Sequence, residues 1–342
     1  MRIAMYYGNQ DVRVEEMPRP QIGPGEMLIK VEASGICGTD VLQWYRINRV
    51  PLVLGHEISG RIAEVGEGVT SYKVGERVAA AHHVSCDVCH YCLSGHQTVC
   101  ETLRKTNFEP GGFSEYVRLP AINVEKGVFP LPDSVSFEKA VFTEPLACVL
   151  RGQRLAGMRP GKAVLIIGSG VSGILHLQLA RFIGANHIVM TDINEYRLDQ
   201  VKQFGADLVL SAKSDIKERF RQLNQGRLAD LVIVTAGAKS AIAQALQSVE
   251  RGGTVLFFAP TEPKTTIPLS INDLFWRNEI SLTSSYGGSP EDYQEALDII
   301  GTKRLKLKEM ITHRLPLEDT ARGFGLVAEA KESLKVIIEP QK

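Results

Sequence analysis

The chain has 342 residues, of which 44% are hydrophobic and 23% are charged, a composition typical of a soluble globular protein with two domains. Its 39 Lys and Arg residues balance its 39 Asp and Glu residues, which argues against a broad surface for nucleic acid or for an anionic membrane. No apolar run approaches the roughly 20 residues that span a bilayer. The N-terminal segment turns polar at once, unlike a signal peptide, so we expect a cytoplasmic protein.

Short apolar segments separated by Gly and Pro predict an irregular β-rich domain over residues 1–148. The segments 26–37, 60–69, 72–81 and 113–120 are the expected strands. A helix is expected over residues 289–302. We expect the tail, residues 286–342, to return to the first domain and complete it.

The middle of the chain, residues 149–285, alternates between strand and helix patterns. Apolar strand segments occur at 162–168, 187–193, 208–212, 229–237, 254–260 and 279–285. Helical segments lie between them, for example over 173–184 and 195–205. This alternation predicts an α/β domain with a doubly wound parallel sheet.

A glycine-rich turn follows the first of these strands and opens a helix. Gly168, Gly170 and Gly173 have the G-x-G-x-x-G spacing, with Val171 and Ser172 between the last two. Such a turn lets the backbone approach a diphosphate at the positive end of the helix. The alternative is an ordinary tight turn, but the complete strand–helix–strand context favours a dinucleotide site.

Asp192 ends the second strand of this unit, and Arg197 follows five residues later. A carboxylate at this place accepts hydrogen bonds from the ribose hydroxyls of NAD and repels the 2′-phosphate of NADP. We therefore expect NAD, with the Arg197 side chain over the adenine.

Four of the six cysteines lie close together, with the spacing C-x2-C-x2-C-x7-C, at Cys86, Cys89, Cys92 and Cys100. Four thiolates complete a tetrahedral zinc site and leave no position for substrate, so the cluster predicts a structural zinc. An iron–sulfur cluster is the alternative, because three closely spaced cysteines are also typical of ferredoxins.

A second candidate metal site is scattered along the sequence. Cys37, His56, Glu57 and Glu144 are of the types that bind zinc, and a catalytic zinc keeps three protein ligands and one open position. Each residue taken alone is more easily explained by packing or surface pairing.

The motifs together resemble those of the zinc-dependent medium-chain alcohol dehydrogenases, most closely the sorbitol and threonine dehydrogenase branch. They are GICGTD, PLVLGHEISGRIAEVGEGVTSYKVGERV, the cysteine cluster, EPLA and VLIIGSGVSG, in this order. The resemblance covers essentially the whole chain. It implies a GroES-like catalytic domain (1–148 with 286–342), a Rossmann domain (149–285), two zinc ions per chain and a homodimer or homotetramer.

By the same resemblance, Cys37, His56 and either Glu57 or Glu144 hold the catalytic zinc. Thr39 matches the hydroxyl residue that begins the family's proton relay. Many members place a histidine three residues later, where this chain has Leu42. This departure leaves open which group ends the relay, and it disfavours threonine dehydrogenase itself.

The other expected binding residues lie at strand ends and in the loop after Cys37. The nicotinamide is expected near the ends of three strands, at Thr235, Ala236, Gly237, Phe258, Ala259, Pro260 and Ser284. By the same resemblance the loop after Cys37 lines the substrate cleft, so Trp44 and Arg46 are the expected substrate contacts. An aromatic wall beside polar groups suits a polyol or sugar, whereas Arg46 and Arg49 would suit a carboxylate or phosphate.

We therefore expect a zinc-dependent enzyme that oxidises a secondary alcohol of a small polyol or sugar with NAD. Zinc would lower the pKa of the bound alcohol, and the nicotinamide would accept the hydride. The alternatives are a dehydrogenase for an amino alcohol, hydroxy acid or sugar phosphate, and a non-catalytic NAD- and zinc-binding redox sensor. A zinc-free quinone reductase would lack Cys37 and His56.

Overall fold

The structure is a computed structural model that describes residues 1–342, and the chain divides into two compact units. The first unit comprises residues 1–147 and 287–342, and the second comprises residues 148–286. The helix α6 (Thr143–Leu155) carries the chain from one to the other.

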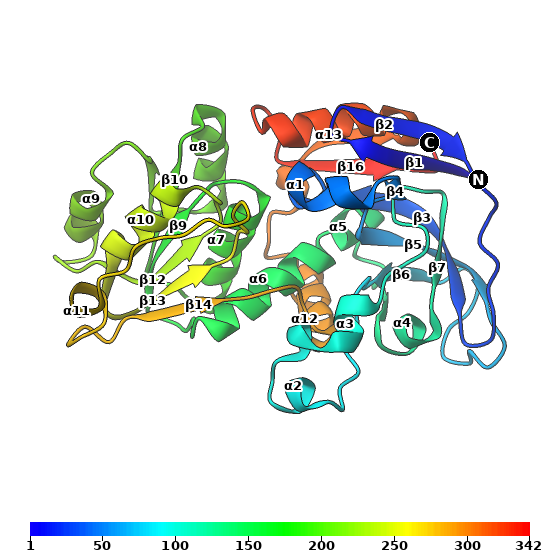
Figure 1. Ribbon diagram of the computed structural model, residues 1–342, viewed down its shortest axis with the longest axis horizontal. Coiled ribbons are helices and arrows are strands. Elements are labelled where there is room, and N and C mark those ends of the chain that lie inside the picture. The colour runs from blue at the N-terminus through cyan, green and yellow to red at the C-terminus, as the bar shows by residue number, and fades with distance from the viewer. The chain divides into compact units, whose positions relative to one another are not determined.

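A mostly antiparallel seven-stranded sheet is the centre of the first unit (Figure 1). Its strands follow the order β15-β16-β3-β5-β6-β8, with β7 paired to β3. The bounds are β3 (Met27–Gly35), β5 (Glu57–Val65), β6 (Arg77–Ala80), β7 (Tyr116–Leu119), β8 (Val128–Pro130), β15 (Ile311–Pro316) and β16 (Lys335–Glu339). The C-terminal strand β16 lies against β3, with Ile337 opposite Gly35, so the tail is part of this unit.

A three-stranded sheet and several short helices complete the first unit. The small sheet has the order β2-β1-β4, from β1 (Arg2–Gly8), β2 (Asp11–Glu16) and β4 (Leu52–Val53). The helices are α1 (Gln43–Arg46), α2 (His90–Leu93), α3 (Glu101–Lys105), α4 (Ala121–Lys126), α5 (Phe137–Ala140), α12 (Pro290–Gly301) and α13 (Thr320–Glu329). Short 3-10 turns occur at Ile47–Arg49, Gln97–Val99, Lys308–Met310 and Leu317–Asp319.

The second unit is a parallel six-stranded sheet in the order β11-β10-β9-β12-β13-β14. This order confirms the predicted doubly wound topology, with the switch in direction between β9 and β12. The strands are β9 (Ala163–Ile167), β10 (His187–Asp192), β11 (Leu208–Ser211), β12 (Ala229–Val234), β13 (Val249–Phe257) and β14 (Ser281–Ser284). Every residue of β9 is buried, as expected for a strand covered by helices on both faces.

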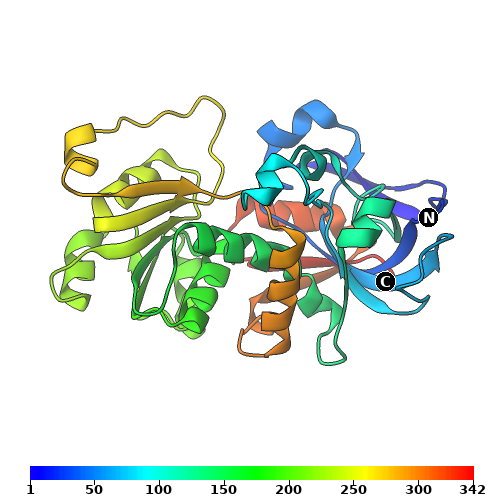
Figure 2. The same cartoon turned by 90° about the horizontal axis from the view of Figure 1, so that it is seen from below.

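Helices flank this sheet in the alternating order that the sequence predicts (Figure 1). They are α7 (Val171–Ile183), α8 (Glu195–Val201), α9 (Ile216–Leu223), α10 (Lys239–Ser248) and the short α11 (Ile271–Leu274), with a 3-10 turn at Lys202–Phe204. Figure 2 shows the segment between β13 and β14, which carries α11, looping away from the edge of the sheet. None of the helices in the structure combines the length and the hydropathy of a bilayer-crossing segment.

Candidate active site and metal centres

The pairing of β3 with β5 brings the scattered metal-ligand candidates together. Gly35 at the end of β3 lies opposite Glu57 at the start of β5. Cys37 and His56 are therefore neighbours, although 18 residues separate them in the sequence. The ligand atoms of Cys37, His56 and Glu57 all lie within 4.8 Å of one another. A thiolate, an imidazole and a carboxylate at this spacing are a donor set suited to zinc.

Asp40 lies directly behind two of these ligands, and the sequence analysis did not identify it. The carboxylate of Asp40 is fully buried. It accepts a hydrogen bond from the Cys37 backbone N–H at 3.0 Å and lies 3.4 Å from Nδ1 of His56. A carboxylate in contact with a ligating histidine fixes the orientation of the ring and increases its basicity.

The electrostatics of this group favour a bound cation. Burial by itself would raise the pKa of Asp40, but the nearby charges of His56 and Arg46 outweigh it and lower that pKa. Burial likewise opposes a charge on His56, yet Asp40 and Cys37 raise its pKa well above the ordinary value. The same negative potential that attracts a proton to His56 would attract a divalent metal, which displaces protons from its ligands.

Glu57 is engaged by a buried lysine. The Nζ atom of Lys335 donates to the Glu57 carboxylate and, at 3.3 Å, to the carbonyl oxygen of Ile36, and both charged side chains are 1% exposed. A Cβ atom at Gly35 would collide with this carboxylate, so glycine is needed there. Glu144, buried in the first turn of α6, is not part of the group formed by Cys37, His56 and Glu57.

Two further histidines lie next to His56. The rings of His56 and His82 are 4.8 Å apart, and those of His82 and His83 are 3.9 Å apart. Burial lowers the pKa of His82 well below its ordinary value and lowers the pKa of His83 to about 4. Both rings are therefore neutral near pH 7 and add no positive charge against a metal.

The three expected site residues in the loop after Cys37 differ in exposure and in their contacts. The hydroxyl of Thr39 donates to the Cys37 sulfur at 3.3 Å. Trp44, on α1, is 36% exposed. Arg46 turns inward, where its Nε atom donates to the carbonyl oxygen of Thr39 at 3.1 Å. The structure thus directs Arg46 toward the polypeptide, whereas the sequence suggested a contact with substrate.

The four clustered cysteines converge on one point. Their Sγ atoms are separated by 3.5 Å (Cys89–Cys92), 3.6 Å (Cys86–Cys100) and 4.0 Å (Cys86–Cys92). Four sulfurs at about 2.3 Å from a central zinc would be about 3.8 Å apart. The sulfur positions therefore fit a tetrahedral thiolate site with every position filled.

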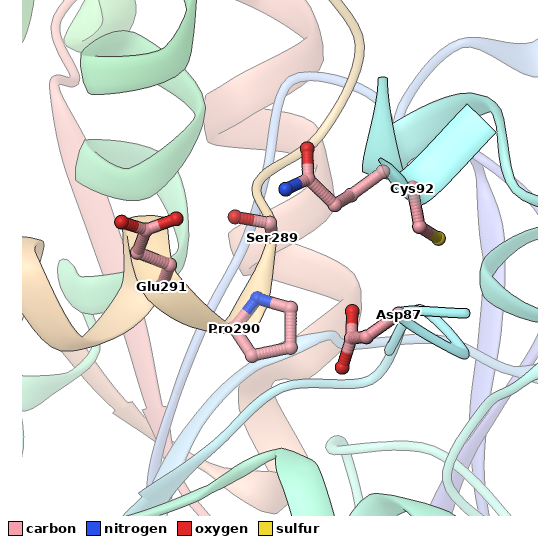
Figure 3. Close-up of a pocket in the computed structure, with 6 residues that line it drawn as sticks. Asp87, Cys92, Ser289, Pro290 and Glu291 are labelled. Carbon is pink, nitrogen blue, oxygen red and sulfur yellow. The ribbon is translucent and has the colours of Figure 1, made fainter. Parts of the chain in front are cut away.

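A groove of about 200 Å³ borders the cysteine cluster, between it and the start of α12. Figure 3 shows Cys92 and Asp87 on one side of the groove, facing Ser289, Pro290 and Glu291. The Cys92 sulfur is turned toward the other thiols, so the groove offers no open coordination position.

The glycine loop of the second unit has the conformation that the motif predicts. Gly168 has φ +107°, and a Cβ atom there would lie 2.5 Å from Oγ1 of Thr235. A Cβ atom at Gly173 would overlap the carbonyl oxygen of Gly168. Val171 and Ser172 begin α7. The loop thus leaves the helix N-terminus open to an anionic group.

Asp192 closes β10 beside this loop. Its carboxylate accepts hydrogen bonds from the backbone N–H groups of Ser169 at 2.6 Å, Ile193 at 2.8 Å and Asn194 at 2.9 Å. The guanidinium of Arg197 lies within 4 Å of the Cβ position of Gly170. Arg197 therefore lies over the glycine loop, and Asp192 is fixed at its edge.

The expected nicotinamide residues lie at the ends of adjacent strands. Thr235 follows β12 and donates to the carbonyl oxygens of Ile167 and Gly168, each at 3.0 Å. The backbone of Phe258 and of Ala259 donates to Val234. Ala236 and Gly237 continue from Thr235, Pro260 continues from Ala259, and Ser284 ends β14. A Cβ atom at Gly237 would lie 2.5 Å from the Pro260 oxygen, so these two turns touch.

Asp40 and Lys335 were not among the site residues predicted from the sequence. Asp40 is the last residue of the GICGTD motif, so its position three residues after Cys37 was a usable signal. Lys335 begins the apolar strand segment of residues 335–338, and a lysine in such a strand requires a buried partner. Only the pairing of β16 with β3 identifies that partner as Glu57.

Comparison with known proteins agrees with this arrangement. The protein-family model of the alcohol dehydrogenase GroES-like domain matches residues 23–133. The family model of the zinc-binding dehydrogenases matches residues 172–302. The chain is 31% identical to the sorbitol dehydrogenase of Bacillus subtilis, over 100% of this chain and 98% of that protein. It is 35% identical to the L-threonine 3-dehydrogenase of Bacillus velezensis, over 96% and 95% of the two chains.

Solved structures give the same result. A zinc-binding dehydrogenase from Sinorhizobium meliloti, determined with bound NADP, has a TM-score of 0.88 and 28% identity over 99% of both chains. These similarities confirm the predicted pairing of a GroES-like domain with a Rossmann domain, and the predicted class of enzyme and cofactors. The chain belongs to the zinc-dependent medium-chain alcohol dehydrogenase family, in the branch of the sorbitol and threonine dehydrogenases.

Proposed function

We propose that this enzyme oxidises a secondary alcohol of a small neutral polyol or sugar to the ketone. The observation that carries the proposal is the convergence of Cys37, His56 and Glu57, backed by Asp40, in a chain similar to sorbitol dehydrogenases. The inward turn of Arg46 supports a neutral substrate. Its guanidinium already faces Asp40 and Thr39, which reduces its capacity to bind a substrate carboxylate.

The residues present divide the chemistry among them. Cys37, His56 and a glutamate would hold zinc, which supplies a Lewis acid for the substrate oxygen. Glu57 is the better-placed glutamate, because it lies with the other two ligands. The hydroxyl of Thr39 lies 3.3 Å from the Cys37 sulfur. It would therefore be within hydrogen-bonding reach of a substrate oxygen bound next to that sulfur. No histidine at position 42 continues a relay from it, so ribose hydroxyls or water would carry the proton onward.

The cofactor is proposed to be NAD. The Asp192 carboxylate is held at the rim of the glycine loop by three backbone N–H groups, where it would repel a 2′-phosphate. We expect the variant Asp192→Ala to lower the ratio of kcat/KM for NAD to that for NADP by about 10- to 100-fold. An unchanged ratio would contradict this role, and Asp199→Ala on the exposed face of α8 is the matched control.

An amino alcohol is the second candidate substrate, because the chain is 35% identical to an L-threonine 3-dehydrogenase. Initial rates with a panel of sorbitol, xylitol, 2,3-butanediol and L-threonine, each with NAD, would decide between the two. We expect a polyol to give the highest kcat/KM. A clear preference for L-threonine would refute the polyol proposal, and no turnover with any alcohol in a protein loaded with two zinc ions would favour a sensor.

We also propose a homodimer or homotetramer joined through the second unit, in a cytoplasmic protein. The edge strand β14 leaves one side unpaired within the chain, and Ile271 and Trp276, in the segment that precedes β14, are 66% and 65% exposed. A reducing compartment suits a protein that uses thiolates as metal ligands. Light scattering would measure the mass, and a monomer would contradict the proposal.

A further inference from the structure

Arg46 makes more contacts to the chain than a solvated loop arginine needs. Its Nε atom donates to the Thr39 carbonyl at 3.1 Å. Its Nη2 atom lies 3.5 Å from the Thr39 hydroxyl and 3.4 Å from the Asp40 carboxylate. The guanidinium also lies over the ring of Tyr45, at 4.7 Å, and the side chain is only 13% exposed.

The two residues that Arg46 contacts are the two that orient the metal-ligand candidates. Thr39 directs its N–H and its hydroxyl at the Cys37 sulfur, at 3.4 and 3.3 Å. Asp40 receives the Cys37 N–H and faces Nδ1 of His56. The planar guanidinium of Arg46 therefore contacts Thr39, which hydrogen-bonds the Cys37 sulfur, and Asp40, which faces the His56 ring.

The shape of arginine matters for this arrangement. Donors on two different nitrogen atoms point in fixed directions, so the guanidinium reaches a carbonyl and a carboxylate at once. A lysine would supply a single compact charge and could not direct fixed donors at both the Thr39 carbonyl and the Asp40 carboxylate. The cation also compensates a carboxylate that has no exposure to water, and such a group is costly to bury unpaired.

We propose that Arg46 is a positioning residue for the catalytic metal site. It locks the turn of residues 37–40 so that the Cys37 thiolate and the His56 imidazole converge on one cation. The inference builds on the proposed function, but it concerns the metal geometry and not the identity of the alcohol. In this role the guanidinium acts on Thr39 and Asp40, in addition to the substrate contact that the sequence predicts for Arg46.

The test compares Arg46→Met and Arg46→Lys with Arg13→Met. Arg13 is the matched control, because it pairs with Asp11 at 2.7 Å and lies over the ring of Tyr7 at 4.6 Å, away from Cys37. Zinc affinity is measured by competition with a chelator. The geometry of the site is measured by the electronic spectrum of the protein loaded with Co²⁺, and kcat and KM are measured with the best alcohol of the panel.

For Arg46→Met we expect zinc affinity at this site to fall by about 10- to 100-fold, with a changed cobalt spectrum. The value of kcat should fall by a similar factor, while KM changes by less than about threefold. Arg46→Lys should lie between Arg46→Met and the wild type, and Arg13→Met should match the wild type.

Wild-type affinity and an unchanged cobalt spectrum in Arg46→Met would overturn the proposal, as would a loss confined to KM. NAD binding and retention of the cysteine-bound zinc show whether Arg46→Met folds. If Arg46→Met does not fold, the same measurements on Arg46→Lys test the proposal. Lysine keeps the positive charge but lacks the two fixed donor directions of the guanidinium. The metal measurements need no substrate, so a wild type that rejects every polyol would refute the proposed function and leave this test intact.

Discussion

The two metal-ligand groups of the first unit are built in opposite ways. The cysteine cluster takes all of its ligands from residues 86–100, and its sulfurs face one another in a closed set. The second group joins Cys37 to His56 and Glu57 across a pair of strands. It depends on Asp40, Arg46 and Lys335, none of which is a proposed ligand.

The difference shows how a structural and a reactive metal site place different demands on a chain. Four thiolates satisfy zinc by themselves and need only a compact loop to hold them. A site that keeps a position open for substrate has fewer ligands to define its geometry. The surrounding hydrogen bonds must then define the geometry of the site, and those of Asp40 with Cys37 and Arg46 are of this kind.

The largest expected effect is the loss of the open site. We expect Cys37→Ala to reduce alcohol oxidation by about 10³-fold or more, because the Lewis acid loses a ligand. Binding of NADH, measured by titration of its dihydronicotinamide fluorescence, should be unchanged because the expected cofactor residues lie in the other unit. Cys148→Ala, a change outside both metal groups, is the control. Turnover near that of the wild type in Cys37→Ala would show that the Cys37 group is not the reactive metal site.

A smaller effect is expected from Asp40→Asn, which keeps the shape of the side chain and removes its charge. The zinc affinity of the Cys37 site should fall by about 10- to 100-fold, because the His56 ring loses its anionic partner. Chelator competition measures it, with Asp11→Asn on the exposed surface as the control. An unchanged affinity would mean that the ligands alone define this site, as they do in the cysteine cluster.

The smallest effect on activity is expected from Cys100→Ser in the closed cluster. The variant should contain about one zinc per chain instead of two, and its melting temperature should fall by about 10 °C. Its kcat per zinc bound at the Cys37 site should stay within about twofold of the wild type. Metal analysis and calorimetry measure the first two quantities. A loss of activity as large as that of Cys37→Ala would show that the two sites do not have separate roles.

Much of the fold could be predicted because short, local sequence patterns determine it. The buried strand at Ala163–Ile167 and the glycine turn after it identify the doubly wound sheet. The four cysteines identify their own site for the same reason, since their spacing alone brings the sulfurs together. In the second unit, the position of Asp192 beside the glycine loop follows from the strand–helix–strand unit itself.

Other contacts had no local signal. Lys335 reaches Glu57 only because β16 lies beside β3, and the two residues are 278 positions apart in the chain. Arg46 has its partners Thr39 and Asp40 within its own loop, but only the folded turn shows that its guanidinium faces them. A side chain's partners depend on which strands become neighbours, and hydrophobic periodicity carries no information on that.

The sequence by itself therefore determined the class of fold, the dinucleotide loop, the closed cysteine cluster and the residue types available for a reactive zinc. The tertiary structure alone decided which of these residues meet, because strand pairing joins Cys37 to His56 and buries the charges that support them. The physical reason is the cost of a buried charge. Asp40 and Glu57 can leave water only where the fold supplies a partner. Arg46 of the same loop faces Asp40, whereas the partner of Glu57, Lys335, lies 278 positions further along the chain.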